Sequence, residues 1–503
     1  MSSASNRLPD GAAFPAAFAG AALRPERTLV RNLFLRLFGV ICFIAFWSLG
    51  SQVTVLFGHD GLLPASAYLQ SMPAARTFLD VPTLFWLDCS DASLRLAALA
   101  GALISVLLIL NLAPRYCLVA LWTLYLSFVT IGQDFLSFQW DNLLLETALF
   151  ALFVAPGGLR GKRQVAPHAI GIFLMQWLLF RLHVESGAAK LLTGDRTWRD
   201  LTAMVGYYET APLPTWVGWY AHQMPLWAHK LCALFTFAIE LGVPLFIWAG
   251  RRLRFAVFLG MLAMQVSVIL TANYGFFNYL TMALCVFVLD DGHLRWVARR
   301  LRWVLAESPP PRQSAGRSPA LAVVALILVP LSVVPFFSFV RPLSRGMLPL
   351  RRTLNVFRSI NAYHLFAQMT LVRREVVIEG STDGVHWLPY EFRYKPGDPL
   401  RAPPFVAPHQ PRVDFQLWFF ALDGRASPRY FTDLLARLFS APRVAAPLFS
   451  QDPFADKAPA LLRVAFYRYQ FSDTATRRAT GAWWVRELLG YSTNMTAESF
   501  DVR

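Results

Sequence analysis

Residues 35–57 read LRLFGVICFIAFWSLGSQVTVLF, and only Arg36 and Gln52 among them carry a charge or a side-chain amide. A helix needs about 20 mainly apolar residues to cross the hydrocarbon core of a bilayer. This stretch therefore predicts a membrane-spanning helix. A scan with the same window finds further candidates, centred on residues 95–113, 116–131, 143–156, 168–189, 231–249, 254–271, 276–289 and 319–340.

These apolar stretches predict a polytopic α-helical membrane bundle followed by a soluble α+β C-terminal domain. Nine spans are the expected number, and seven are the alternative because the stretches at 143–156 and 276–289 are short enough to be re-entrant. The 503-residue chain is only 16% charged, whereas soluble domains carry about a quarter charged residues. The expected organisation is a loose cytoplasmic N-terminus (1–31), a helical bundle (32–340) and an extracytoplasmic domain (341–503).

The net charge of +16 is interpreted as a signal of membrane topology, and no nucleic-acid partner is expected. Short cytoplasmic loops are enriched in Lys and Arg, and here basic residues alternate between successive connecting segments. One set of segments carries Arg7, Arg24, Arg27, Arg31, Arg115, Arg160, Lys162, Arg163, Arg251, Arg252, Arg254, Arg295, Arg299, Arg300, Arg302, Arg312 and Arg317; the other carries Arg76, Arg196 and Arg199. The N-terminus is thus expected inside and, with nine spans, the C-terminal domain outside.

The last third of the chain changes its pattern. Residues 376–380 and 385–387 flank Asp383-Gly384, a pair typical of a β-hairpin turn. Residues 430–439 fit an amphipathic helix, and residues 461–471 alternate as a strand does. Before the ninth span, Trp296 to Leu305 carries several arginines and is typical of a basic interfacial helix, and residues 308–318 are a Pro-rich linker.

Neither a cofactor nor a metal is expected. The five cysteines are Cys42, Cys89, Cys117, Cys232 and Cys285. None lies in the predicted C-terminal domain, and no Cys/His spacing typical of a zinc or redox site is present.

Ionisable residues inside predicted spans form a candidate polar cluster. Such residues are costly in lipid, so they mark the interior of a bundle and make function the first hypothesis. Arg181 and Glu185 are four residues apart and can pair within one helix. The whole cluster is Asp141, Glu146, Arg181, His183, Glu185, Lys190 and Glu240. Two interpretations stay open: a catalytic or substrate pocket, or mutual neutralisation that fixes helix packing, with Lys190 reaching outward.

The longest outer segment, 191–228, is expected to lie along the outer membrane face. It carries the aromatic residues Trp198, Tyr207, Tyr208, Trp216, Trp219, Tyr220 and Trp227. Aromatic rings of this kind are typical of the headgroup region, where they anchor a protein at the interface.

Several longer stretches resemble the lipase maturation factor family. They are 138–146 (FQWDNLLLE), 197–202 (TWRDLT), 208–214 (YETAPLP), 361–363 (NAY), 390–392 (YEF), 395–399 (KPGDP), 412–414 (RVD) and 418–419 (WF). The resemblance implies a membrane protein of the endoplasmic reticulum that helps secreted lipases to fold, with its C-terminal domain on the luminal side. Because Lys is scarce beside Arg, a bacterial member in the inner membrane is a second interpretation.

Two function hypotheses follow. The first is a non-enzymatic, chaperone-like membrane factor that assists folding, maturation or assembly of a secreted lipase or another exported client, with membrane lipids around it. Its candidate client-binding or family-motif residues are Trp198, Arg199, Asp200, Tyr208, Glu209, Tyr390, Gly397, Asp398, Asp414 and Trp418. The second is a membrane-embedded enzyme that acts on a lipid-like or protein substrate through the intramembrane polar cluster.

Overall fold

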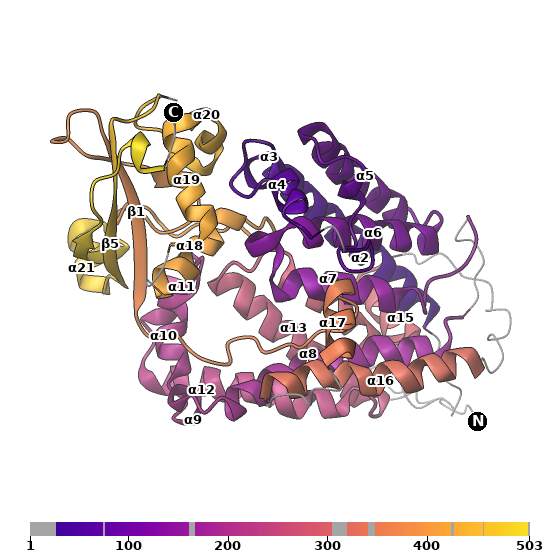
Figure 1. The fold of residues 1–503 in the computed structure, drawn as a ribbon. Helices are drawn as coiled ribbons and strands as arrows, with labels where there is room; N and C mark the ends of the chain where they lie inside the picture. Colours follow the sequence, from indigo (N-terminus) through magenta and orange to yellow (C-terminus); the bar gives the residue numbers. More distant parts are fainter. Residues whose placement is uncertain are drawn as a thin grey trace, which may run out of the picture.

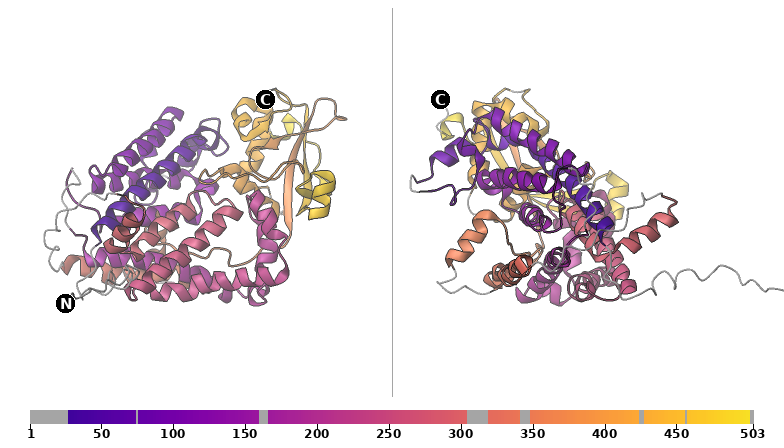
Figure 2. Two further views of the ribbon diagram at one scale, coloured as in Figure 1. Left: turned by 180° about the vertical axis from the view of Figure 1, so that it is seen from behind. Right: turned by 90° about the vertical axis from the view of Figure 1, so that its right-hand side faces the viewer.

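A computed structural model of the chain describes residues 27–73, 76–159, 166–303, 319–340, 348–423, 427–455 and 457–500. Figure 1 shows a bundle of helices with a smaller region of strands and helices at its upper left. The two further views in Figure 2 keep this arrangement, with the strands at one end of the bundle. The arrangement confirms a helical bundle followed by an α+β region.

Helices lie at all nine predicted spans. They are α2 (Thr28–Gly50), α5 (Asp91–Ile109), α6 (Pro114–Ile131), α7 (Gln139–Ala151), α8 (Ala169–Leu192), α12 (Leu226–Phe237), α13 (Arg251–Thr271), α14 (Phe277–Cys285) and α16 (Pro319–Val340). A π-helical turn (Ala238–Gly242) and a 3-10 turn (Val243–Phe246) continue α12, and a 3-10 turn (Val286–Val288) continues α14. Shorter helices are α3 (Val53–Phe57), α4 (Ala65–Gln70), α9 (Arg196–Arg199), α10 (Ala203–Thr210), α11 (Trp216–His222), α15 (Asp291–Arg300) and α17 (Leu348–Phe357), with 3-10 turns at Leu84–Trp86 and Gln133–Leu136.

Within the described residues, six segments are long and apolar enough to cross a membrane. They are α2, α5, α6, α12 with its two turns, α13 and α16. The expected number of nine is higher because α7 and α14 are short, as anticipated for the fourth and eighth stretches. Helix α8 has 24 residues but carries Arg181, Glu185 and Lys190.

The first span begins and ends earlier than predicted. The carboxylate of Asp291 accepts the backbone N–H groups of Thr28 and Val30 at 2.9 and 3.0 Å, so it fixes the start of α2. At the other end the Gln52 amide donates to the carbonyls of Ser48 and Gln410, both at 2.8 Å. The chain therefore turns after Gly50, and residues 53–57 form the separate helix α3 instead of extending the span.

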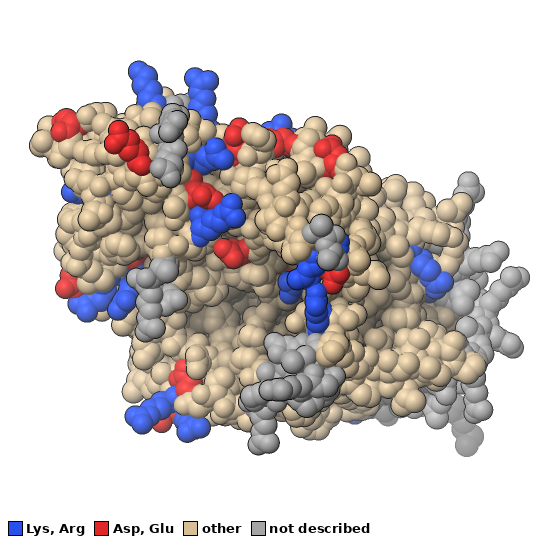
Figure 3. Space-filling model, in the orientation of Figure 1, with Lys and Arg blue, Asp and Glu red and all other residues tan. Residues whose placement is uncertain are grey.

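The surface of the bundle is apolar over its outer helices. Only 11% of the span in α16 and 22% of that in α13 is buried within the protein. In Figure 3 the lower part of the surface, over α12 and α16, carries few charged side chains apart from a group over α9. Many charged side chains cover the C-terminal region in the same view. An apolar band around a polytopic bundle is what a surrounding bilayer requires, and the chain is an integral membrane protein.

Several basic residues expected at the cytoplasmic face gather at one end of the bundle. Arg251 and Arg254 pair with Asp290 at 2.9 and 2.7 Å, and the Arg27 guanidinium donates to the Phe287 carbonyl at 2.8 Å. Helix α15, at the predicted basic interfacial segment, lies at this end, opposite the strands (Figure 1). Arg160, Lys162, Arg163, Arg312, Arg317 and the linker 308–318 lie outside the described residues.

The C-terminal region holds two antiparallel sheets, one of order β2-β1-β5-β6 and one of β3 with β4. Its elements are β1 (Arg373–Ser381), β2 (Leu388–Pro389), β3 (Glu391–Phe392), α18 (Arg412–Asp423), α19 (Arg429–Ser440), α20 (Pro442–Ala445), β4 (Phe449–Gln451), β5 (Leu461–Phe471), α21 (Thr474–Thr480) and β6 (Trp484–Tyr491), with 3-10 turns at Ala446–Leu448 and Ala497–Phe500. The predicted hairpin is confirmed, since β1 pairs with β2 across the Asp383-Gly384 turn. The predicted helix 430–439 is α19, and the predicted strand 461–471 is β5.

The segment between α17 and β1 does not behave as a linker outside the bundle. Asn361 and Tyr363 are 7% and 0% exposed, and both contact helices of the bundle. The domain boundary near residue 341 stays a prediction, and the buried residues of the 358–372 segment pack against the bundle.

Candidate functional site

The residues of the predicted polar cluster are buried, but they divide into separate groups, and the first is centred on Arg181. Its guanidinium lies 2.7 Å from a Glu146 carboxylate oxygen and 3.0 Å from a Glu185 oxygen. The pairing of Arg181 with Glu185 within α8 is as predicted, and Glu146 comes from the neighbouring helix α7. All three side chains are almost fully buried, so each depends on its partners for stabilisation of its charge.

Residues of the C-terminal part complete this group. The backbone N–H and the side-chain amide of Asn361 both donate to Glu146 at 3.0 Å, and the Tyr363 hydroxyl donates to it at 2.7 Å. The backbone N–H of Tyr363 donates to Glu185 at 3.0 Å. Arg181 also donates to the Asn361 carbonyl. Two carboxylates that share one arginine are thereby satisfied by groups that lie far away in the sequence.

A second ion pair joins Lys190 of α8 to Glu240 in the π-helical turn, with Nζ 2.8 Å from the carboxylate. Lys190 also donates to the Leu365 carbonyl at 2.9 Å and lies 5.2 Å from the centre of the Trp198 ring. It is 2% exposed. The interpretation that Lys190 reaches outward is therefore wrong, because Glu240 and the 358–372 segment hold it inside.

The third group links Asp141 of α7 to Arg412 of α18. The guanidinium contacts both carboxylate oxygens, at 2.7 and 2.8 Å, and Tyr125 donates to the same carboxylate at 2.6 Å. Asp141 is 0% and Arg412 is 2% exposed. A bidentate pair of this kind is geometrically specific, so it orients the C-terminal domain on the bundle.

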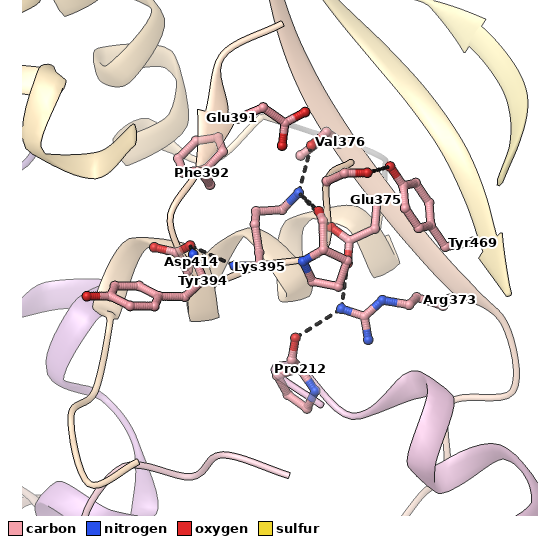
Figure 4. Close-up of polar contacts among 12 residues, drawn as sticks. Pro212, Arg373, Glu375, Val376, Glu391, Phe392, Tyr394, Lys395, Asp414 and Tyr469 are labelled. Carbon is pink, nitrogen blue, oxygen red and sulfur yellow. Dashed lines mark hydrogen bonds and ion pairs between the residues drawn. The ribbon is translucent and has the colours of Figure 1, made fainter. Parts of the chain in front are cut away.

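A further charged group lies on the side of the C-terminal domain (Figure 4). Arg373 at the start of β1 donates to the carbonyls of Glu209 and Pro212 at 2.9 and 3.0 Å, and it pairs with Glu375. Lys395 lies 2.8 Å from the same Glu375 carboxylate. The segment that follows α10 is thus bound to the sheet through its backbone.

Part of the segment 191–228 forms an interface between the bundle and the C-terminal region. Trp198, Tyr207, Tyr208 and Trp219 are at most 6% exposed. The Trp198 indole donates to the Phe366 carbonyl at 2.9 Å. For these four rings the expectation of membrane anchoring is wrong, because they pack between the bundle and the C-terminal region. Trp216, Tyr220 and Trp227 are exposed.

The residues predicted for client binding divide by exposure. Arg199, Asp200 and Asp398 are exposed, and Trp418 is half-buried with its indole bonded to the Thr210 carbonyl at 2.9 Å. The others, Trp198, Tyr208, Glu209, Tyr390, Gly397 and Asp414, are buried.

Several of these buried residues have structural partners. Asp414 accepts the backbone N–H groups of Tyr394 and Lys395 at 2.9 Å, and the Gly397 carbonyl accepts the Tyr469 hydroxyl at 2.6 Å. Burial raises the pKa of the Asp414 carboxyl.

The sequence interpretation missed the partners that come from the C-terminal part. Asn361, Tyr363 and Arg412 lie in stretches that resemble the family. Hydropathy periodicity did not indicate a role for any of them. His409 was missed as well; its ring lies 2.9 Å from the Ser48 hydroxyl, and burial together with the Arg412 charge lowers its pKa to about 4.

Within the described residues, no group of three or more His, Cys, Asp or Glu side chains could hold a metal. His183 is the member of the predicted cluster that stays apart from the ion pairs. Its Nδ1 lies 2.9 Å from the Leu179 carbonyl, and its Nε2 has no partner among the described residues.

The arrangement describes a polytopic membrane protein with ion-paired charges inside the bundle and one buried pair, Asp141 with Arg412, between the bundle and the C-terminal domain. Comparison with known proteins gives the family. Residues 29–296 match the lipase maturation factor transmembrane domain, and residues 359–493 match the lipase maturation factor C-terminal domain. The chain belongs to the lipase maturation factor family.

Relatives share about a third of their residues with the chain. Lipase maturation factor 2 of Homo sapiens is 33% identical over 91% of the chain and 81% of its own length. Lipase maturation factor 1 of Bos taurus is 33% identical over 92% of the chain and 88% of its own length. No solved structure matches the chain.

Proposed function

We propose that this chain is a membrane factor that assists the maturation of secreted lipases. The names of its relatives support the lipase as the client. The geometry of the polar cluster supports a non-enzymatic role, because Asp141, Glu146, Arg181, Glu185, Lys190 and Glu240 are all engaged in ion pairs. The enzyme alternative is not favoured.

The test is lipase activity per unit of secreted lipase protein. Cells that lack the chain should secrete lipase of lower specific activity, with unchanged lipase messenger RNA, and reintroduction of the chain should restore it. Unchanged specific activity of every secreted lipase would refute the proposal. A variant changed only at the exposed Arg468–Glu487 pair serves as a control that should still restore activity.

We further propose that the C-terminal domain lies on the extracytoplasmic or luminal side, either of the endoplasmic reticulum or of a bacterial inner membrane. The gathering of Arg27, Arg251 and Arg254 at the opposite end of the bundle supports this orientation. In a background without the native cysteines, a cysteine at Val385, which is 73% exposed, should react with an impermeant thiol reagent on the outer side. A cysteine at exposed Arg299 should be protected. The reverse pattern would refute the orientation.

Contact with the client is proposed at exposed positions of this outer side. A photoreactive residue at Asp398 should capture the lipase, whereas one at Tyr390, which is 2% exposed, should not. Exposed side chains alone can contact a partner while the fold is intact. Equal capture at both positions would indicate an unfolded domain and would refute the docking surface.

A further inference from the structure

A cavity of about 210 Å³ lies between the bundle and the 358–372 segment. Helices α8, α12, α13 and α14 contribute to its wall, and Tyr207, Tyr274 and Phe366 lie at the side of the C-terminal domain. Its lining is mainly aromatic and aliphatic. A dry apolar cavity of about 150 Å³ is already large enough for benzene, so this cavity can hold a small head group together with part of a chain.

Several buried polar atoms of the wall make no hydrogen bond among the described residues, and the most informative is in His183. His183 lines the cavity and is 3% exposed, and its Nε2 makes no hydrogen bond among the described residues. Its Nδ1 lies 2.9 Å from the Leu179 carbonyl oxygen. Because a carbonyl only accepts, Nδ1 carries the hydrogen, and Nε2 of the uncharged ring is an acceptor. A ligand that satisfies this atom must donate a hydrogen bond.

The other polar groups of the wall favour an uncharged ligand with hydroxyl groups. Lys190 and Glu240 are the charged lining residues within the described chain, and they neutralise each other at 2.8 Å. No cation is left over for a carboxylate or a phosphate. The hydroxyls of Tyr207 and Tyr274 are also buried in the wall and interact with each other, and a hydroxyl can both donate and accept.

The cavity opens toward the apolar surface of the bundle. Phe235 of α12 and Ser267 of α13 line it and are themselves exposed. Only 28% of the α12 span and 22% of the α13 span is buried within the protein, so the outer faces of both helices face lipid. A molecule can therefore reach the cavity from the bilayer, with its apolar chain between the two helices.

We propose that this cavity binds an uncharged, hydroxyl-bearing single-chain lipid, such as a monoacylglycerol. The glycerol hydroxyls occupy the interior, where one of them donates to His183 Nε2. The acyl chain leaves between α12 and α13 into the bilayer. The site includes the Lys190–Glu240 pair in its wall, but not the Asp141–Arg412 pair that joins the bundle to the C-terminal domain. It does not depend on the identity of the client.

The test uses the full chain in lipid nanodiscs and a monoacylglycerol with a photoreactive, clickable acyl chain. Labelled peptides should come from α12 and α13. Unlabelled monoacylglycerol should compete with this labelling at a concentration at least about 10-fold lower than the methyl ester of the same fatty acid, which has no hydroxyl. Equal competition by the methyl ester, stronger competition by the free fatty acid or by cholesterol, or labels confined to α16 would each overturn the proposal.

Variants locate the site independently of activity. His183→Phe removes the acceptor and should raise the competing concentration roughly 5–10-fold, the effect of one net hydrogen bond. Met264→Trp at the half-buried wall of α13 should abolish labelling by filling the opening. Leu259→Trp, on an outward position of the same helix with 47% exposure, is the matched control and should leave labelling unchanged. If the control loses labelling as well, the label reports lipid around the protein and the proposal fails.

Discussion

Replacing Arg412 with methionine tests whether the C-terminal domain is held on the bundle by its ion pair with Asp141. The substitution keeps much of the side-chain volume but removes the guanidinium that contacts both carboxylate oxygens. Asp141 is 0% exposed; without Arg412, its remaining hydrogen-bond donor among the described side chains would be Tyr125, with the Arg358 charge nearby. Removal of one partner of a buried pair typically costs about 3–5 kcal/mol. We expect a loss of stability of that size for Arg412→Met.

The assay is the labelling rate of a buried cysteine. In a background without the native cysteines, a cysteine at Leu417, which is 0% exposed, reacts with a thiol reagent only when α18 leaves the bundle. A cost of about 3–5 kcal/mol corresponds to a rise in that rate of roughly 150-fold to 5,000-fold. The exposed pair of Arg468 with Glu487 supplies the control, since Arg468→Met removes an interaction of only about 0–1 kcal/mol.

The double variant Asp141→Leu with Arg412→Met separates charge from packing. Replacing a whole buried ion pair with apolar residues is often close to neutral, so the double variant should recover most of the lost stability. If Arg412→Met alone changes the labelling rate less than about five-fold, the pair does not hold the domain. If the double variant is as unstable as the single one, the cost comes from packing and not from an unpaired carboxylate.

Two further predictions concern the same joint, and a third concerns the packing of two helices within the bundle. Tyr363→Phe leaves the buried Glu146 carboxylate short of one donor and should cost about 1–3 kcal/mol in the same cysteine assay. Burial and a neighbouring guanidinium lower the pKa of His409 to about 4. The contribution of the neutral ring to the free energy of unfolding is therefore fully present above the ordinary pKa of 6.5, and it should fall as pH drops from 6.5 toward 4. A His409→Asn variant should lose this pH dependence, which amounts to at most about 1.4 kcal/mol per pH unit. Gly101→Ala should destabilise the packing of α5 on α2, because an added Cβ would collide with the Phe46 ring. The temperature of its thermal unfolding transition should therefore fall. Ala100→Ser, at the half-buried neighbouring position, should leave that temperature nearly unchanged.

The bundle was predictable because its signals are local. Apolar length locates a helix at each expected span, and the i, i+4 spacing of Arg181 and Glu185 predicts their contact. The same logic could not find Asn361 for Glu146 or Arg412 for Asp141, since these partners are 215 and 271 residues apart. A pattern within one helix indicates which face is interior, but it does not indicate which distant segment fills that interior.

The four buried rings of segment 191–228 were misinterpreted for a different reason. Tryptophan and tyrosine combine a large apolar ring with one polar group, which suits a membrane interface and a protein interface equally. Trp198 and Trp219 satisfy their indole N–H groups with Phe366 and Ser472 of the C-terminal part. Composition alone cannot distinguish this partner from a lipid headgroup.

The pairing of Asp141 with Arg412 also imposes an order in time. A chain emerges from the ribosome with its N-terminal part first, so α7 is in place well before α18 has been made. Until then the Asp141 carboxylate lacks the guanidinium that neutralises it, and a buried carboxylate without its partner is strongly destabilising. Truncation anywhere before residue 412 would leave the membrane part permanently in that immature state, so the C-terminal domain acts as the chain's own final assembly step.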